Sequence, residues 1–231
     1  MATNPIVIDV SHHQPDPIDW TRVRHSGTMG VILKATEGVD YEDPTYGVRA
    51  AEARNAGLFV SAYHFLRPGD ISAQMDSFVA TANLPRGGRL VVDFEDPAST
   101  FDELEEAVLH LFAMRDYQVT VYGSNVLVDA CKGQYSEVLG KTALWQARYS
   151  STPPQVPTNI WPTWSLWQYT DEAIVDGITG PCDANRWNGD PDALANWFQL
   201  PEIPDNLITM DIVVPVGSQL RLTINGIEYQ T

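Results

Sequence analysis

The segment RLVVDFEDP, residues 89–97, is a short run of β-branched and aromatic residues that ends at a proline. This pattern predicts a buried β-strand. The segment carries two carboxylates, Asp93 and Glu95, two positions apart. Because side chains alternate along a strand, both are expected on the same face. A strand that brings two acids together near its carboxyl end indicates a site for acid–base chemistry.

Apolar runs of strand length recur along the chain, and helix-like segments separate several of them. The strand-like runs are residues 5–11, 29–38, 58–65, 89–96, 117–124, 142–149 and 164–171, with a weaker one at 180–189. Amphipathic helices are predicted at 43–57, 71–84 and 101–116. Apolar strands that alternate with helices are typical of parallel βαβ units, so the chain is predicted to be α/β, an irregular (β/α)8-like barrel. The proline-rich segment 150–162 is predicted to be a loop.

Polar side chains gather at the carboxyl ends of the predicted strands. In barrels of this kind the active site forms at that end. The residues concerned are Asp9, Ser11, Glu37, Tyr63, His64, Asp93, Glu95, Tyr122, Trp145, Gln168 and Asp183. We therefore expect one polar site at the mouth of the barrel.

The residue types at this mouth suit carbohydrate chemistry. Burial and a neighbouring negative charge raise the pKa of a carboxyl group, so one acid of a pair can stay protonated near neutral pH. Paired carboxylates are the usual equipment of glycoside hydrolysis. Aromatic residues that could stack on sugar rings are Tyr63, Tyr122, Trp145, Trp161, Trp164 and Trp167.

A longer string of motifs resembles the signature of the glycoside hydrolase family 25 lysozymes. The motifs are DVSHHQP (9–15), ILKATEGVDYED (32–43), YHF (63–65), DFE (93–95), VYGS (121–124), LWQARY (144–149), LWQYTD (166–171) and DANRW (183–187). The resemblance covers about residues 5–190. It implies an irregular β/α barrel that cleaves the β-1,4 bond between N-acetylmuramic acid and N-acetylglucosamine in peptidoglycan.

The resemblance also implies roles for individual residues. Glu95 would be the general acid, and Asp93 would orient a substrate 2-acetamido group that attacks the anomeric carbon, which gives retention. Asp9 would complete the catalytic set and, with Asp183, a ring of four acids. The residues expected to bind substrate are Asp183, Tyr63, Glu37, Tyr122, Trp145 and Gln168. For Glu37 a structural role at the rim is the alternative, because Lys34 lies three residues earlier.

Composition excludes several classes of protein. The net charge is −16 and no cluster of lysine and arginine occurs, which argues against nucleic acids and anionic membranes as partners. No apolar run approaches the roughly 20 residues of a membrane span. The histidines and cysteines lack zinc-site spacing, so no metal and no cofactor are expected. Cys131 and Cys182 are interpreted as two ordinary thiols, with a single disulfide as the alternative.

The resemblance ends before the last thirty residues, so we expect a catalytic barrel at 1–200 and a β extension at 201–231. Alternating apolar residues and the NG dipeptide at 225–226 predict strands and a hairpin there. Self-association through this extension is the leading interpretation of its role. Packing against its own barrel and binding to the wall are the alternatives.

The start of the chain, MATNPIVIDVSHHQ, shows no signal-peptide pattern. We therefore expect a phage endolysin made in the host cytoplasm that acts on the bacterial cell wall after release, with a phage structural lysin or a bacterial protein exported by another route as alternatives. Two other functions stay open. A non-catalytic sugar-binding barrel would not need both Asp93 and Glu95, and a chitinase-like glycosidase would carry further aspartates before the DFE motif, which GRLVVDFE (88–95) lacks.

Overall fold

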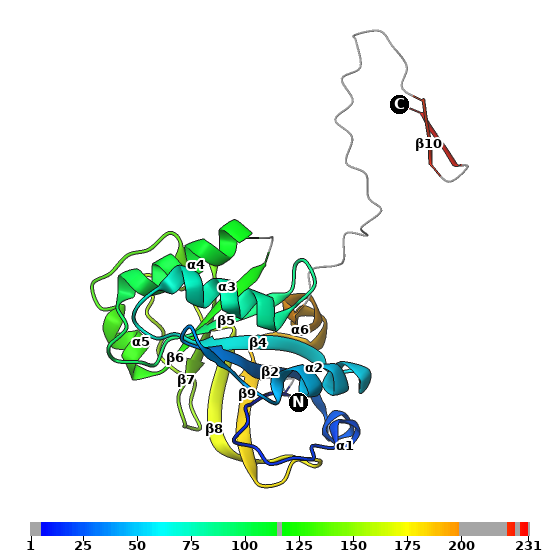
Figure 1. Ribbon diagram of the computed structural model, residues 1–231, viewed down its shortest axis with the longest axis horizontal. Coiled ribbons are helices and arrows are strands. Elements are labelled where there is room, and N and C mark those ends of the chain that lie inside the picture. Colours follow the sequence, from blue (N-terminus) through cyan, green and yellow to red (C-terminus); the bar gives the residue numbers. More distant parts are fainter. Residues whose placement is uncertain (1–5, 115–116, 199–220, 225–226, 231) are drawn as a thin grey trace. The chain divides into compact units, whose positions relative to one another are not determined.

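A computed structural model of the protein describes residues 6–114, 117–198, 221–224 and 227–230. The chain divides into two compact units, Met1–Pro201 and Glu202–Thr231. The first unit holds the predicted site and is an α/β barrel (Figure 1).

Eight strands form the barrel. They are β1 (Ile6–Val10), β2 (Thr28–Glu37), β4 (Phe59–Phe65), β5 (Arg89–Asp93), β6 (Gln118–Gly123), β7 (Ala143–Ala147), β8 (Leu166–Ile174) and β9 (Pro181–Trp187). Their order is β1-β9-β8-β7-β6-β5-β4-β2, and the pairing of β1 with β2 closes the ring. The short β3 (Tyr41–Glu42) pairs antiparallel with the end of β2. The predicted α/β barrel is thus confirmed.

Strand β9 breaks the parallel pattern that we expected of the whole barrel. It runs antiparallel to both of its neighbours, β8 and β1. A parallel neighbour requires a crossover of a dozen or more residues, whereas β8 and β9 are joined only by residues 175–180. Gly177 and Gly180 take positive φ angles of 100° and 85° in this turn, which suits a tight reversal of the chain.

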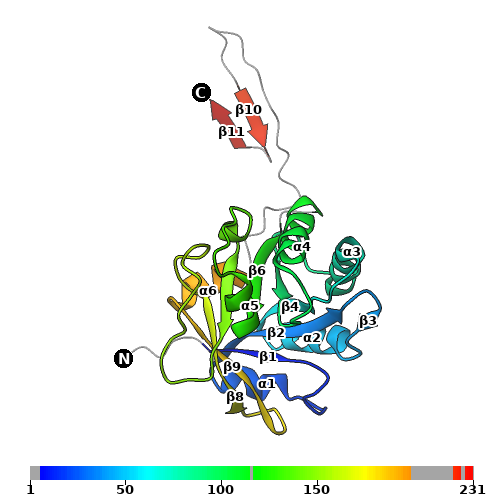
Figure 2. The same ribbon diagram turned by 90° about the vertical axis from the view of Figure 1, so that its left-hand side faces the viewer.

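The helices lie on the outside of the strands (Figures 1 and 2). They are α1 (Trp20–His25), α2 (Tyr46–Asn55), α3 (Ile71–Ala82), α4 (Phe101–Met114), α5 (Asn125–Ala130) and α6 (Pro191–Phe198), with a 3-10 turn at Leu139–Lys141. The three predicted helices correspond to α2, α3 and α4. The other three are six to eight residues long, too short for a clear periodic pattern. Segment 150–162 contains no helix or strand, as predicted.

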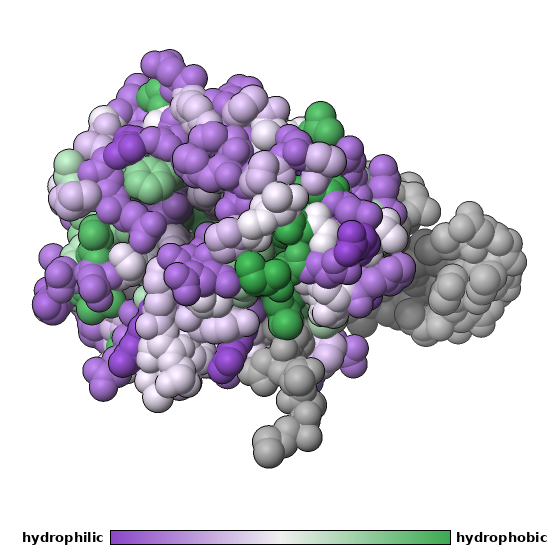
Figure 3. Space-filling view, turned by 90° about the horizontal axis from the view of Figure 1, so that it is seen from below, coloured by the Kyte–Doolittle hydropathy of each residue, from purple (hydrophilic) through white to green (hydrophobic). Residues whose placement is uncertain are grey.

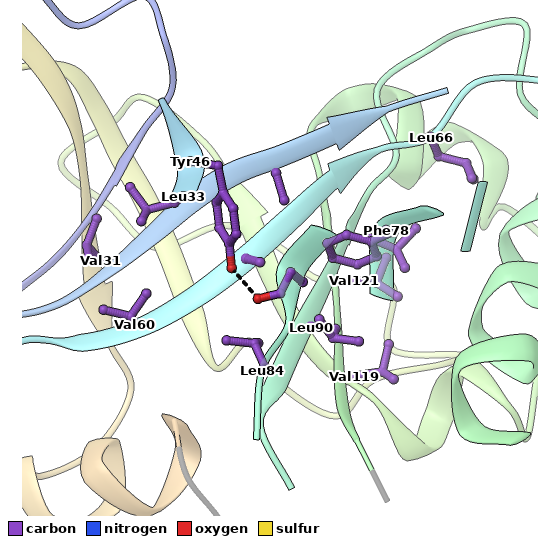
Figure 4. Close-up of a cluster of buried hydrophobic side chains, with 14 of the residues drawn as sticks. Val31, Leu33, Tyr46, Val60, Leu66, Phe78, Leu84, Leu90, Val119 and Val121 are labelled. Carbon is purple, nitrogen blue, oxygen red and sulfur yellow. Dashed lines mark hydrogen bonds between the residues drawn. The ribbon is translucent and has the colours of Figure 1, made fainter. Parts of the chain in front are cut away.

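Side-chain alternation along the strands separates two apolar cores. On β5, Leu90 and Val92 point outward to the helices, whereas Val91 points into the barrel. Figure 4 shows part of the outer core, in which Phe78 of α3 packs near strand residues and the Tyr46 hydroxyl donates a hydrogen bond of 2.7 Å to the Ala82 carbonyl. The same alternation continues to Asp93, which therefore points into the barrel at the end of β5.

Helix α6 contributes to the core inside the barrel, at the amino-terminal ends of the strands. Phe198 packs against Gly30, where an added Cβ would lie 2.5 Å from the ring, so only glycine fits. Trp197 accepts a hydrogen bond of 2.5 Å at its carbonyl from Arg89 Nε, and the Arg89 guanidinium lies 4.3 Å from the Trp197 ring centre. These contacts fill one end of the barrel and leave the carboxyl ends of the strands for the site.

The outer surface is mainly hydrophilic on the face that Figure 3 shows, with apolar residues in small separate patches. Among the described residues, no helix combines the length and the apolar character of a membrane span. Cys131 and Cys182 are buried free thiols, so the disulfide alternative is wrong.

The second unit contains β10 (Arg221–Ile224) and β11 (Ile227–Gln230), which pair antiparallel with Ile224 opposite Ile227. This pairing agrees with the predicted hairpin. The other predicted strand of the extension, with Ile208, Met210, Ile212 and Val214, lies outside the described residues.

Candidate active site

A small hollow opens at the carboxyl ends of the barrel strands, with a volume of about 150 Å³. We call it the acidic pocket. Its lining consists of Asp9, Tyr63, Asp93, Glu95, Tyr122, Trp145, Tyr149, Gln168 and Asp183. All the residues predicted to be catalytic or to bind substrate, except Glu37, therefore meet in one place, although they come from segments spread over the chain. Ser11 and His64, which were also expected at the mouth of the barrel, do not line this pocket.

Of the two acids Asp93 and Glu95, Asp93 is the more deeply buried. It is 5% exposed, and its Oδ1 has no hydrogen-bond partner among the described residues. Burial raises the pKa of Asp93 well above its usual range, the charge of Glu95 raises it further, and Lys34 acts in the opposite direction. Buried polar atoms in native proteins are nearly always paired, so this oxygen is available to accept a hydrogen bond from a ligand.

Glu95 follows the end of β5 and lies nearer to solvent than Asp93. Burial raises the pKa of Glu95, and a hydrogen bond with Ser124 opposes that rise. A carboxyl group with a raised pKa keeps its proton closer to neutral pH and can then donate it to a reacting oxygen. Glu95 is thus suited to be a general acid.

Asp9 is held by two amide groups on neighbouring strands. Gln168 Nε2 donates to its Oδ1 at 3.1 Å, and Asn185 Nδ2 donates to its Oδ2 at 2.7 Å. Burial raises the pKa of Asp9 well above its usual range and the charge of Asp183 adds to the rise, whereas the two amides oppose it. Asp9 is therefore fixed in position even before a ligand arrives.

The orientation of both amides follows from their other partners. The Gln168 Oε1 accepts hydrogen bonds from the hydroxyls of Tyr122 at 2.8 Å and Tyr149 at 3.3 Å. The Asn185 Oδ1 accepts one from Trp145 Nε1 at 2.7 Å. Since each amide oxygen is occupied by a donor, each NH2 group is left to face Asp9.

This network favours a supporting role for two residues that were predicted to bind substrate. Trp145 and Gln168 are each 2% exposed, and their polar groups are already paired within the protein. They position Asp9 and support the wall of the pocket. Tyr149 and Asn185 belong to the same network and were not predicted, although they stand in the LWQARY and DANRW motifs.

Asp183 lies directly opposite Asp9 on the paired strands β1 and β9. Burial raises the pKa of Asp183 to about 6, with further contributions from the charges of Asp171 and Glu95. Tyr63 and Tyr122 also have pKa values well above their usual range, because of burial and the surrounding acids. Both tyrosines are therefore neutral hydroxyl donors in the pocket.

Glu37 does not line the acidic pocket. Its carboxylate pairs with Lys34 Nζ at 2.5 Å and with Arg67 Nη2 at 2.6 Å, and Arg67 also pairs with Asp96 at 2.7 Å. Burial would raise the pKa of Glu37, but the hydrogen bonds from Lys34 and Arg67 outweigh it and lower the value. The geometry thus favours the structural alternative for Glu37 over substrate binding.

Other candidates from the sequence lie away from the pocket. Trp161 and Trp167 are each 2% exposed and pack within the protein, so they offer no free ring to a sugar. His64 is buried between Thr36 and Gln74, and burial lowers its pKa to about 4. In the part of the chain that the structure describes, no three histidine, cysteine or acidic side chains are arranged so that they could hold a metal ion.

A second and larger hollow, of about 670 Å³, adjoins the acidic pocket. We call it the wide cleft. Its lining consists of Glu95, Tyr122, Ser124, Asn125, Val128, Gln146, Ala147, Arg148, Tyr149, Pro154 and Gln155. Glu95, Tyr122 and Tyr149 line both hollows, so the candidate general acid lies where they meet.

Known proteins resemble the chain in sequence and in fold. The family model described as glycosyl hydrolases family 25 matches residues 8–178. Lysozyme M1 of Streptomyces globisporus is 31% identical over 199 residues, which is 79% of this chain and 67% of that protein. The N,O-diacetylmuramidase of Chalaropsis sp. is 27% identical and aligns over 73% of this chain and 89% of its own length.

Among solved structures, the bacterial lysozyme from Streptomyces coelicolor superimposes with a TM-score of 0.76 at 28% identity. The match covers 86% of this chain and 98% of that one. The barrel described above therefore has the architecture of a known lysozyme.

Proposed function

This chain belongs to the glycosyl hydrolases family 25, and we propose that it is an N-acetylmuramidase that cleaves the β-1,4 bond between N-acetylmuramic acid and N-acetylglucosamine in peptidoglycan. Relatives named lysozyme and N,O-diacetylmuramidase support this activity. The observation that carries it is the pairing, at one pocket, of Glu95 with the buried Asp93 and its unpaired oxygen.

In the proposed mechanism Glu95 protonates the leaving glycosidic oxygen. Asp93 Oδ1 accepts the N–H of the substrate 2-acetamido group and holds its carbonyl oxygen against the anomeric carbon. That oxygen displaces the leaving group and forms a cyclic oxazolinium intermediate. Water then attacks the anomeric carbon, Glu95 takes a proton from this water, and the acetamido group is restored. The two inversions give overall retention. Use of a substrate group as the nucleophile is a known exception to the mechanism in which an enzyme carboxylate attacks.

The remaining acids and hydroxyls stabilise the reacting sugar. The transition state carries positive charge near the anomeric carbon, and carboxylates beside it lower its energy. Asp9, fixed by Gln168 and Asn185, is positioned for this role. The neutral hydroxyl of Tyr63 can donate a hydrogen bond to the sugar or to its acetamido group.

Glycan strands of peptidoglycan are the partner that this activity implies, and the bacterial cell wall is the place of action. We do not expect nucleic acids or membranes as partners. The endolysin type of the enzyme and its synthesis in a host cytoplasm stay predictions from the sequence.

The activity is tested by the loss of turbidity of a purified peptidoglycan suspension, followed by mass analysis of the released fragments. A muramidase leaves N-acetylmuramic acid at the new reducing end. A new reducing end on N-acetylglucosamine would contradict the proposal, and the absence of any release would favour a sugar-binding barrel. Faster cleavage of chitin oligosaccharides than of peptidoglycan would favour the chitinase-like alternative.

A further inference from the structure

We propose that the wide cleft binds the leaving-group side of the glycan and that Arg148 recognises a carboxylate of the stem peptide carried by that strand. This inference rests on the proposed function, since it names what the same site recognises beyond the scissile bond.

The positions of the two central acids assign the two hollows to the two sides of the bond. Asp93 lines the acidic pocket only, whereas Glu95 lines both hollows. The sugar whose acetamido group reacts must lie beside Asp93, and thus in the acidic pocket. The general acid must contact the bridging oxygen, so the sugar beyond that oxygen extends into the wide cleft.

The two hollows differ in charge. Four carboxyl groups line the acidic pocket, and no basic residue does. The wide cleft is lined by one acid, Glu95, and one base, Arg148, among neutral residues. An anionic group that extends into the wide cleft therefore meets the one basic side chain in its lining, Arg148.

Arg148 is free to take a ligand carboxylate. It is exposed just after the end of β7, and its Nη1 donates to the Pro153 carbonyl at 3.2 Å. No carboxylate of the described residues lies within 4.0 Å of it, although the chain has a net charge of −16. A guanidinium group has five N–H donors in a planar fork that matches a carboxylate, so most of its capacity remains available.

The rest of the cleft is suited to a sugar. Gln146 is 5% exposed, and its Oε1 has no partner in the described structure, so a hydroxyl or acetamido N–H of a bound sugar could satisfy it after a small rotation of the amide. The Tyr149 side chain is 57% exposed and offers a ring face at the junction of the two hollows. A volume of about 670 Å³ exceeds what a single sugar fills, which leaves room for part of the following N-acetylmuramic acid.

Stem peptides supply the matching group. The sugar that leaves into the wide cleft is N-acetylglucosamine, so the stem peptide that can reach Arg148 belongs to the N-acetylmuramic acid that follows it along the strand. Such peptides carry free carboxylates, and chitin has no such group. The protein and the wall are both negatively charged, so long-range electrostatics oppose their contact. Arg148, which has no carboxylate partner among the described residues, can then favour substrates that present a carboxylate in the wide cleft.

The test measures binding, so that it does not depend on cleavage. Glu95→Gln serves as the parent protein, because it leaves the glycan intact. The ligands are a soluble peptide-bearing fragment of two disaccharide repeats and the same fragment after its carboxylates have been converted to amides with carbodiimide and ammonia. We compare the parent with its Arg148→Gln and Arg148→Lys derivatives by calorimetry. Arg24→Gln is the matched control, since Arg24 is exposed, makes no ion pair with any described residue and does not line the cleft.

We expect amidation of the ligand to weaken binding to the parent about tenfold, the size of one charge-assisted hydrogen bond. Arg148→Gln should bind the native fragment about tenfold more weakly than the parent and should not distinguish the two fragments. Arg148→Lys should keep part of the preference, and Arg24→Gln should behave like the parent. An unchanged melting temperature shows that Arg148→Gln is folded.

Equal affinity of the parent for both fragments, or an undiminished preference in Arg148→Gln, would overturn the inference. Lysis of peptidoglycan by the wild-type chain is measured separately. If the wild-type chain does not lyse peptidoglycan, the proposed function is contradicted, while the binding comparison still decides the role of Arg148.

Discussion

Asp9 and Asp183 face each other directly across the antiparallel strands β1 and β9. Burial raises the pKa values of both, to about 6 for Asp183, and the charge of Asp183 raises the pKa of Asp9 further. Because two adjacent carboxyl groups resist losing both protons, the pair titrates as a unit and keeps a proton to a higher pH than either isolated acid would. The two acids belong to the candidate active site, but their ionisation in a buried position lowers the free energy of unfolding.

Asp183→Asn should therefore stabilise the protein, and only above acidic pH. Folding raises the pKa of Asp183 from 3.8 to about 6, so its contribution to stability falls as the pH rises from about 4 through 6. The full shift corresponds to about 3 kcal/mol, which we reduce to about 1–2 kcal/mol for partial exposure and coupling. Urea unfolding should show this gain in the free energy of unfolding at pH 7 and little gain at pH 4. A similar change at both values would contradict the explanation.

Glu95→Gln should abolish proton donation and leave binding intact. The substitution keeps the shape of the side chain but removes its acidic proton, so kcat should fall by about 10²-fold or more. The dissociation constant for a peptidoglycan fragment should change little. Glu172→Gln, at an exposed position of β8, is the control and should keep normal activity. Near-normal lysis by Glu95→Gln would show that Glu95 is not the general acid.

Ser124→Ala should shift the pH dependence of kcat. The hydrogen bond with Ser124 stabilises the ionised form of Glu95 and lowers its pKa. Loss of that bond raises the pKa, so Glu95 stays protonated to a higher pH and the alkaline limb should move to higher pH. The measurement is kcat against pH for both proteins. A limb that moves downward would show that another group controls it.

Retention should be visible in the first product. If the acetamido group acts as the nucleophile, NMR of the fresh hydrolysis mixture should show the β anomer before mutarotation. A thiazoline analogue of the intermediate should bind the wild-type protein and bind Asp93→Ala much more weakly. Initial formation of the α anomer would exclude this mechanism and make Asp9 or Asp183 the candidate base for an attacking water.

The C-terminal extension should mediate self-association. An isolated two-stranded hairpin such as β10–β11 is marginally stable in water and presents unpaired backbone groups along its edges. A second copy of the extension can pair with these groups, and several linked sites would increase avidity for the wall. Sedimentation should show an oligomer for the full chain and a folded, active monomer for a chain that ends at Pro204. A monomeric full chain at micromolar concentration would contradict this prediction.

Much of the barrel was predictable because its signals are local. Period-two alternation along β5 predicted the face on which Asp93 lies, although the strand ends there and Glu95 follows it, and helical repeats located α2, α3 and α4. Strand ends rich in polar residues indicated one common site, because the parallel strands of a barrel all end on the same side. None of these inferences required a distant contact.

The tertiary structure decided what depends on partners far apart in the sequence. Gln168 lies 159 positions from the Asp9 that it holds, and no local pattern shows that its amide is already occupied. Glu37 stands in a motif shared with the predicted site, yet Lys34 and the distant Arg67 hold it outside the pocket. The sequence by itself determined which side chains reach the mouth of the barrel. Only the tertiary structure decided which of them remain free to bind a ligand. Residues such as Asp9 and Gln168 come within hydrogen-bonding distance only when β1 pairs with β2 and β9 and the barrel closes.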